Sequence, residues 1–365
     1  MKVVLLHDWL TGHRGGERVL EAFCEMFPDA PLYTLIHVPG CSTPLIENRK
    51  IVTSWINNFP DIKDGYRKYL PLFPLAADSL KITEQADLVI SSSHCVIKGV
   101  KKPFGAKHLS YVHSPMRYIY DQFDNYFGKE SPWWQTLGAK AFRPYLQTWD
   151  KISNDNVDMM IANSGFVQDR IHKFYEKNAA IVHPFVDLKD FEAVQKNPPA
   201  KEDFYLMVTA FAPNKKVGLA IEAFNRLGYN LKIIGSGQQA VYLKGQARNN
   251  IRFLGNLSRE KVIDLMAQAK GFIFPGVEDF GITPLESLAA GTPVIAFKEG
   301  GVLETLNDDV CEFFTTSTVE ALIQAIKKFE KRQFDTDKMY KRADQFSRGI
   351  FINKMKNQID LLFSK

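Results

Sequence analysis

Strand-like apolar runs alternate with amphipathic helical stretches along almost the whole chain. In the first half these runs are residues 3–7, 32–38, 51–55, 88–91, 108–113 and 157–162. A second series comprises residues 204–209, 231–234, 251–254, 271–274 and 293–297, each followed by a turn signal and a helical stretch. The alternation predicts an α/β fold with parallel sheets, because two parallel strands need a crossover connection, usually a helix.

A polar connector with two prolines, residues 193–203, separates the two series. The length of 365 residues exceeds the usual size of one domain. We therefore expect two similar α/β domains, residues 1–196 and 200–348, that face a central cleft. Ligands of open α/β sheets bind beyond the carboxyl ends of the strands, so polar residues in the loops after strands are the candidate site residues.

Composition narrows the functional classes. No apolar stretch approaches the roughly 18 residues of a membrane span, and the first strand-like run leads into His7 rather than a cleavage site. We expect a cytoplasmic protein. A formal charge of +5 suits anionic substrates or peripheral contact with an acidic inner membrane surface, and is too small to indicate nucleic-acid binding. The cysteines (Cys24, Cys41, Cys95 and Cys311) lack metal or disulfide spacing, so we expect reduced thiols and no metal site.

The segment 274–295 carries the clearest functional signal. A strand-like run enters a glycine-containing loop and then a short helix, for which Thr283 suits the N-cap, Pro284 the first turn and Gly291 the end. The unpaired N–H groups at the start of such a helix attract phosphate.

Glu278 and Glu286 flank this predicted helix start, where their carboxylates can accept hydrogen bonds from hydroxyl groups. A polyol next to a phosphate indicates a nucleotide sugar. The pattern Thr283-x-x-Glu286 also fits a capping box that needs no ligand. Glu278 lies upstream of the helix and has no capping role, so it is the less ambiguous residue.

Two loops after strands of the first half supply further candidates. Gly15 and Gly16 precede a helix and would let backbone amides approach a phosphate, although an ordinary tight turn fits the same pattern. His113 ends a strand-like run and suits a contact with a sugar hydroxyl or a proton transfer, the alternative being a structural histidine. Arg117 could bind a phosphate of the donor or of the acceptor, and the alternative is an ion pair with Asp121, four residues further along the chain.

In the second half, Lys215 and Lys216 lie at the end of the loop that follows residues 204–209. They could neutralise the charge of a diphosphate, and the alternative is that they are solvated surface lysines. Gly235 and Asn256 follow later strand-like runs, where they offer backbone donors or form simple turns. Residues 57–78 mix cations with aromatic and aliphatic side chains, which fits contact with a membrane or lipid acceptor, or a packed proline turn. Trp133 and Trp134 suit stacking on sugars or a place in a core.

Taken together, these patterns resemble the motif set of family 4 retaining glycosyltransferases of the GT-B fold, over nearly the whole chain. The resemblance rests on Glu278-x7-Glu286, Gly15-Gly16-Glu17, Lys215 and residues 300–304. Further segments resemble bacterial mannosyltransferases that build O-antigen and exopolysaccharide: residues 91–94, 98–100, 112–118, 162–164 and 184–187.

The resemblance implies a role for each motif. Glu286 would bind the ribose hydroxyls, Glu278 the sugar or its reacting region, and Lys215 the diphosphate. Phosphate-facing and sugar-facing groups would be Gly15, Gly16, His113 and the backbone of Phe280, Gly281, Ile282 and Thr283. It also implies that the last helix, within residues 349–365, crosses back onto the first domain.

The chain departs from the family pattern at Ala210, where an arginine five residues before the diphosphate lysine is usual. A charge-assisted hydrogen bond contributes roughly 1.5 to 3 kcal/mol, so donor binding would weaken about 10- to 150-fold unless another cation substitutes. Lys216 and Arg14 are the candidates. Asn214, Gly218 and Phe185 also differ from the subgroup pattern.

We expect a metal-independent, retaining transfer of a hexose, with GDP-mannose favoured as donor, onto a hydroxyl of a growing, lipid-linked glycan in bacterial polysaccharide synthesis. The nucleotide sugar is a substrate, and no cofactor is expected. One alternative is an epimerase or hydrolase that uses the nucleotide sugar without an acceptor. Another is an inactive subunit that binds a glycan or a partner transferase.

Overall fold

The computed structural model describes residues 1–12, 15–128, 133–237 and 239–364. The chain divides into two compact units, one of Met1–His183 with Phe351–Lys365 and one of Pro184–Ile350. The connector 193–203, which the sequence suggests as the boundary, lies inside the second unit. Residues just before it already belong to that unit, because Val186 is buried and its N–H donates to the carbonyl of Phe346 at 2.9 Å.

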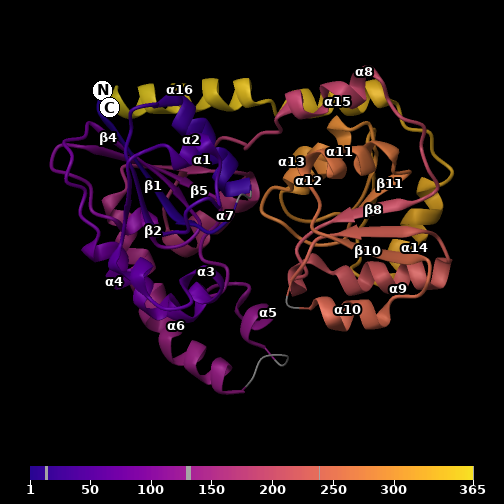
Figure 1. Cartoon of the computed structure of the whole chain (residues 1–365), viewed down its shortest axis with the longest axis horizontal. Coiled ribbons are helices and arrows are strands. Elements are labelled where there is room, and N and C mark those ends of the chain that lie inside the picture. Colours follow the sequence, from indigo (N-terminus) through magenta and orange to yellow (C-terminus); the bar gives the residue numbers. More distant parts are fainter. Residues whose placement is uncertain (13–14, 129–132, 238, 365) are drawn as a thin grey trace. The chain divides into compact units, whose positions relative to one another are not determined.

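The first unit (Figure 1) contains, within the described residues, a seven-stranded parallel sheet, and its strand order is β3-β2-β1-β4-β5-β6-β7. The strands are β1 (Val3–Leu10), β2 (Leu32–His37), β3 (Ile51–Thr53), β4 (Leu88–Ser93), β5 (Lys107–Val112), β6 (Met159–Ala162) and β7 (Ala179–Ile181). The sequence predicts all of these except β7. It ends the first strand too early, at residue 7, because β1 continues to Leu10.

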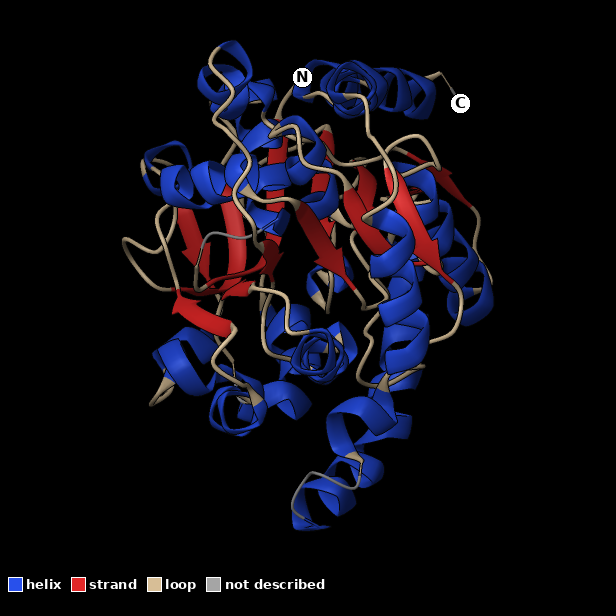
Figure 2. Ribbon diagram, turned by 90° about the vertical axis from the view of Figure 1, so that its right-hand side faces the viewer, coloured by secondary structure: helices blue, strands red, loops and turns tan. Residues whose placement is uncertain are grey.

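Helices cover both faces of this sheet (Figure 1), and the side view of the molecule likewise shows helices on both sides of the strands (Figure 2). They are α1 (Gly15–Met26), α2 (Pro44–Glu47), α3 (Ile62–Gly65), α4 (Phe73–Ser79), α5 (Phe123–Phe127), α6 (Trp133–Ser153), α7 (Gly165–Tyr175) and α16 (Arg348–Phe363), with 3-10 turns at Trp55–Asn58, Tyr66–Leu72, Ile97–Gly99 and Asn154–Asn156. Phe351 of α16 lies 5.9 Å from Phe23 of α1 and 5.7 Å from Tyr111 of β5, measured between ring centroids. The C-terminal helix therefore packs on the first unit, as predicted.

The segment 57–78 is largely packed. Tyr66, Phe73 and Ala76 are buried in the core of the first unit, whereas Leu75 is exposed. The packed-turn interpretation therefore describes most of its apolar side chains. Trp133 and Trp134, in contrast, are 77% and 60% exposed, so the interpretation of this pair as core residues is wrong.

The second unit contains, in its described part, a six-stranded parallel sheet of order β10-β9-β8-β11-β12-β13. Its strands are β8 (Tyr205–Val208), β9 (Leu231–Ile234), β10 (Ile251–Gly255), β11 (Gly271–Phe274), β12 (Val294–Phe297) and β13 (Cys311–Phe314). Only β13 is missing from the sequence prediction.

Two helical layers enclose this second sheet, with α9, α10 and α14 on one side and α11, α12 and α13 on the other (Figure 1). The helices are α8 (Glu192–Lys196), α9 (Val217–Leu227), α10 (Ala240–Gln246), α11 (Arg259–Gln268), α12 (Ile282–Ala289), α13 (Val302–Thr305), α14 (Val319–Phe329) and α15 (Thr336–Asp344), with 3-10 turns at Leu188–Phe191 and Pro213–Lys215. Phe224 and Ile326 share one buried cluster, and Met266 and Leu288 share the other. Both units are thus parallel sheets between helices, as predicted.

Candidate functional site

In the first unit, one serine hydroxyl links two histidine rings. His7 of β1 pairs in register with Ser92 of β4, and Nδ1 of His7 lies 3.1 Å from the Ser92 hydroxyl oxygen. The same oxygen lies 2.8 Å from Nε2 of His113, which follows β5 directly. His7 and Ser92 are fully buried, and His113 is only partly buried. The predicted residue His113 therefore contacts the Ser92 hydroxyl, which in turn contacts His7 on the next strand of the sheet.

The surroundings keep His7 neutral. Burial, reinforced by the neighbouring His94, lowers the pKa of His7 from 6.5 to about 3. Burial raises the pKa of the adjacent Asp8, while backbone N–H groups of His94, Cys95 and Ile97, which donate to its carboxylate over 2.6 to 2.9 Å, act in the opposite direction. Asp8 thereby holds the loop that follows β4.

The start of helix α1 lies against both linked rings. The helix begins at Gly15, and a Cβ placed on Gly16 would lie 3.7 Å from Cε1 of His7 and 3.8 Å from Nε2 of His113. These are ordinary van der Waals distances, so this packing alone does not require glycine at position 16. The predicted contribution of Arg14 falls outside the described residues.

Arg117 lies in the loop after His113, where its Nε donates to the Ser114 hydroxyl at 3.2 Å. The carboxylate of Asp121 is bound by Arg170 through two contacts of 2.7 and 2.8 Å. Asp121 is thus bound by an arginine of α7, and the suggested pairing of Arg117 with Asp121 stays a prediction. Arg170 also donates to Ser114 at 2.8 Å and so braces this loop.

In the second unit, Lys215 and Glu278 form an ion pair between the loops after β8 and β11. Both side chains are mostly buried, with 16% and 22% exposed. The loops approach closely at Gly276, where a Cβ would lie 2.6 Å from the carbonyl oxygen of Asn214. Lys215 is therefore a specifically paired residue, and the solvated-surface interpretation does not describe it.

A third loop, after β12, supports the Glu278 backbone. Gly301 donates its N–H to the carbonyl of Glu278 at 2.9 Å. Gly300 has a φ of +83°, and a Cβ there would lie 2.6 Å from the same carbonyl oxygen. The backbone around Glu278 is thus held by a segment in which glycine is needed.

Helix α12 begins earlier than the sequence suggests. Its N-cap is Gly281, with a φ of 88°, and its first residue is Ile282, so the prediction of Thr283 as N-cap is wrong. The left-handed conformation of glycine turns the chain into the helix two residues sooner. No side-chain capping bond forms, which removes the capping-box interpretation of Thr283 and Glu286. The helix ends at Ala289, and Gly291, with a φ of 73°, follows it as expected.

Glu286 pairs with Arg259, a residue that the sequence does not single out. Nη1 of Arg259 lies 2.8 Å from Oε1 of Glu286. Nη2 of the same guanidinium is buried without a hydrogen-bond partner in the described part of the chain. A lone arginine in a first helical turn carries no local signal of a site.

The remaining predicted residues lie in loops of the second unit. Phe280 is buried and contacts Phe346, so only its backbone can contact a ligand. Gly235, with a φ of 134°, needs glycine because a Cβ would lie 1.9 Å from the carbonyl oxygen of Thr209. Lys216 is exposed, and its backbone has a left-handed conformation. Asn256 is exposed in the loop after β10.

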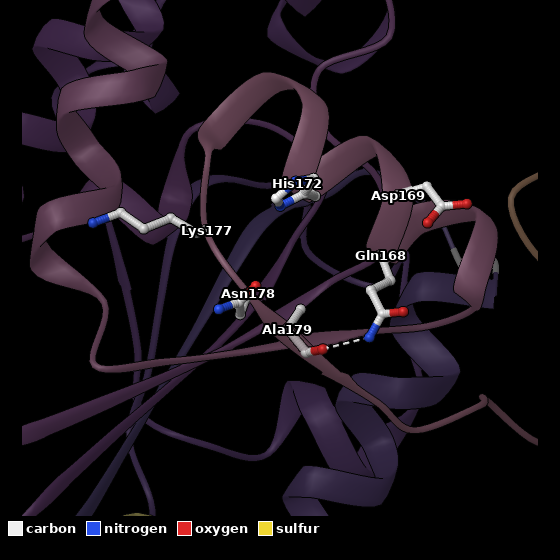
Figure 3. Close-up of a pocket in the computed structure, with 6 residues that line it drawn as sticks. All are labelled: Gln168, Asp169, His172, Lys177, Asn178 and Ala179. Atoms are coloured by element: carbon white, nitrogen blue, oxygen red, sulfur yellow. Dashed lines mark hydrogen bonds between the residues drawn. The ribbon is translucent and has the colours of Figure 1, made fainter.

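A shallow hollow elsewhere in the first unit is separate from these residues (Figure 3). It is lined by Gln168, Asp169, His172, Lys177, Asn178 and Ala179. Because β7 begins at Ala179, the hollow lies at the amino edge of the sheet, whereas His113 lies at the carboxyl edge. The side chain of Gln168 closes part of it by donating to the Ala179 carbonyl at 2.7 Å.

The described residues contain neither a cluster of metal ligands nor a membrane-spanning helix. No group of three or more histidine, cysteine, aspartate or glutamate residues there is arranged to hold a metal ion, and metal independence stays a prediction. None of the helices described combines the length and hydropathy needed to cross a membrane.

Comparison with protein families gives two matches that follow one another along the chain. The profile of "Glycosyltransferase Family 4" matches residues 13–190, and that of "Glycosyl transferases group 1" matches residues 189–348.

Among curated proteins, the chain is 24% identical over 251 residues to alpha-1,3/1,6-mannosyltransferase ALG2 of Dictyostelium discoideum, covering 56% of this chain and 60% of that protein. It is 29% identical over 168 residues to an uncharacterized glycosyltransferase of Methanocaldococcus jannaschii, covering 43% and 45%. The matches thus span about half the length of these relatives.

Solved structures match over almost the full length. Sucrose-phosphate synthase from Thermosynechococcus elongatus gives a TM-score of 0.75 at 17% identity and covers 100% of both chains. HepE of Anabaena, solved in complex with UDP-glucose, gives 0.69 at 17% identity and covers 99% of this chain and 100% of its own. WaaG, a glycosyltransferase of lipopolysaccharide biosynthesis, gives 0.67 at 16% identity, with 97% and 98% covered. These likenesses show the two-domain GT-B fold.

Proposed function

Because the chain belongs to family 4 of the glycosyltransferases, we propose that it moves a hexose from a nucleotide sugar to a hydroxyl of a glycan acceptor, with retention of the anomeric configuration. The observation that carries this proposal is the Lys215–Glu278 ion pair, which joins two loops after strands of the second sheet. A cation and a carboxylate in contact suit a ligand that carries a diphosphate and a sugar.

Lys215 acts on the leaving diphosphate. As the glycosidic bond breaks, negative charge grows on the phosphate oxygens, and a cation held in a mostly buried position stabilises that charge. Because Glu278 pairs with Lys215 before the donor binds, the diphosphate replaces one partner of an existing pair. Glu278 then accepts hydrogen bonds from the sugar.

The start of α12 and Glu286 bind the rest of the donor. The first N–H groups of an eight-residue helix lack intrahelical partners and attract a phosphate oxygen. Glu286 accepts hydrogen bonds from the ribose hydroxyls, and Arg259 fixes the direction of its carboxylate. Ala210 provides no cation, so Lys216 is the proposed substitute for the family arginine.

His113 contacts the hexose near its anomeric carbon, as the resemblance implies, and Gly15 and Gly16 bring backbone amides of α1 to the phosphate. Arg117 is proposed to bind the acceptor side. These roles are independent of the donor base.

GDP-mannose is the proposed donor, and two kinds of relatives bear on it. The ALG2 proteins are named mannosyltransferases, which supports mannose. HepE binds UDP-glucose, so a uridine donor is the competing outcome.

A lipid-linked acceptor and peripheral contact with an acidic membrane surface complete the proposal, placed in bacterial polysaccharide synthesis. Exposed Trp133, Trp134 and Leu137 on α6 support it, being 77%, 60% and 61% exposed. Tryptophan prefers the membrane–water interface.

The deciding experiment has two stages. A thermal-shift screen of GDP-, UDP-, ADP- and TDP-sugars identifies the donor, and transfer to acceptor glycans is then measured with wild type, Lys215→Met and Glu278→Ala. We expect both variants to lose about 100-fold or more in kcat. Lys338→Met, which breaks an exposed ion pair with Asp309 in the same unit, should transfer like wild type.

Donor incubated without acceptor separates transfer from epimerisation or hydrolysis. If wild type consumes donor equally fast with and without every acceptor tested, the transferase proposal is wrong. If no nucleotide sugar binds at all, an inactive binding subunit becomes the better description.

A further inference from the structure

We propose that Ser92 is a positioning residue, whose hydroxyl donates to Nε2 of His113 and thereby holds the ring proton of neutral His113 on Nδ1. The hydrogen-bond arrangement involves only residues of the first unit. Its catalytic consequence rests on the proposed function.

A serine hydroxyl has a single proton to donate. The Ser92 oxygen lies within hydrogen-bond distance of two imidazole nitrogens, Nδ1 of His7 at 3.1 Å and Nε2 of His113 at 2.8 Å. It can donate to only one of them and must accept from the other. The tautomers of the two histidines are therefore coupled through Ser92.

The second ring nitrogen of His7 decides between the two arrangements. Nε2 of His7 is buried and has no hydrogen-bond partner within the described residues. If His7 carried its proton there, a buried N–H would be unpaired, whereas a proton on Nδ1 leaves only an unpaired lone pair. Unpaired buried donors are the rarer case in proteins. His7 therefore donates from Nδ1 to Ser92, and Ser92 donates to Nε2 of His113.

The consequence is a fixed direction of hydrogen bonding at His113. A neutral histidine that accepts at Nε2 carries its proton on Nδ1, and the bond made by one ring nitrogen sets the state of the other. Free neutral histidine in water favours the opposite tautomer, so removing the Ser92 hydroxyl should let His113 change.

The test is a long-range ¹H–¹⁵N spectrum of the histidine rings, assigned with His113→Gln and His7→Gln. We expect the Nδ1–H tautomer for His113 in wild type and the Nε2–H tautomer in Ser92→Ala. Ser91→Ala is the matched control: Ser91 lies on the same strand and makes the same kind of bond, 2.9 Å from Nε2 of buried His108. It should change His108 and leave His113 as it was.

The turnover number kcat should fall in the variants in which the tautomer of His113 changes. Ser92→Ala should lower kcat about 10-fold, with a smaller change in the KM of the donor, and Ser92→Thr, which keeps the hydroxyl, should restore it. Ser91→Ala should keep the wild-type kcat. If Ser92→Ala does not fold, Ser92→Cys, of similar size but a weak donor, serves in its place.

An Nε2–H tautomer of His113 in wild type would overturn the proposal, as would a His113 spectrum unchanged by loss of the hydroxyl. Failure of the proposed function is a separate result, because the spectrum needs no substrate. Absence of glycosyl transfer by wild type would refute the function and leave the Ser92 arrangement to be decided by the spectrum.

Discussion

Nη1 of Arg259 lies 2.8 Å from Oε1 of Glu286, although the two residues belong to different helices. The guanidinium is held on its other side by Asp190, at 3.1 Å, and stands over the ring of Phe191 at 5.1 Å. The proposed ribose-binding carboxylate therefore has a fixed direction before any ligand arrives. Nη2 of the same guanidinium remains buried without a partner in the described chain, and its N–H groups can donate to a ligand oxygen.

Arg259→Gln should weaken nucleotide binding about 10-fold, because Glu286 loses the charged group that orients it. Isothermal titration with the nucleotide measures this loss. Arg226→Gln is the matched control, since Arg226 pairs with Glu222 and Glu320 on the surface of the same unit. Equal affinities for wild type and Arg259→Gln would show that the pair has no part in binding.

The regular part of the fold is predictable from sequence because local patterns determine it. Alternating apolar runs and amphipathic stretches correctly give parallel sheets and the long helices. The missed strands are short: β7 is Ala179–Ile181, and β13 has the sequence Cys-Glu-Phe-Phe, without alternation or a clear turn signal. Their strand character comes from pairing with neighbours, which no local pattern records.

The candidate site is predictable as a set of loops and much less as a set of contacts. Lys215 and Glu278 are recognisable separately, but their pairing depends on two loops that approach at Gly276. The sequence pattern places the start of α12 too late, because Gly281 in a left-handed conformation replaces a polar side-chain cap. Ser92 lies in one of the segments that carry the family resemblance, residues 91–94, but its bond to His113 has no local signal. The same holds for the pairing of Arg259 with Glu286, because in both cases the partner lies elsewhere in the sequence.

Gly276→Ala should damage the site more than a glycine substitution normally does. A Cβ there would lie 2.6 Å from the carbonyl oxygen of Asn214 and 2.8 Å from Cα of Lys215, and both are backbone atoms that cannot rotate away. We expect the free energy of unfolding to fall by about 1–3 kcal/mol. The rate of glycosyl transfer should fall by a larger fraction than the free energy of unfolding does.

Urea denaturation and transfer assays measure the two effects. Gly245→Ala is the control, since it lies in α10 with open space around its Cβ position, and alanine there should stabilise by up to about 1 kcal/mol. If Gly276→Ala behaves like Gly245→Ala, the close approach of the loops has no energetic importance.

Two buried neutral histidines should make stability fall in mild acid. Burial lowers the pKa of His7 to about 3 and that of His108 to about 4, both from 6.5. Between those values and 6.5 the unfolded chain binds a proton that the folded chain does not, so stability rises with pH and falls as pH drops below about 6.5. Each histidine contributes a slope of up to about 1.4 kcal/mol per pH unit.

Urea denaturation measures the free energy of unfolding of wild type and His108→Asn from pH 6.5 to 4.5. The difference between the two proteins isolates the contribution of His108, because the contributions of Asp8 and the other carboxyl groups cancel. The variant should show the smaller loss of stability in acid. Parallel curves for the two proteins would mean that His108 titrates alike in the folded and unfolded states.

Helix α6 should mediate binding to anionic membranes. Its exposed Trp133, Trp134 and Leu137 suit the interfacial region of a bilayer, and residues 133–149 contain Lys140 and Arg143 but no acidic residue. Replacing the three apolar side chains by serine should weaken cosedimentation with phosphatidylglycerol vesicles about 10-fold, because the buried apolar area is lost. Serine at Val241 and Tyr242, exposed by 87% and 64% on α10, should leave binding unchanged. If both sets of substitutions have the same effect, general surface hydropathy explains the binding and α6 has no special role.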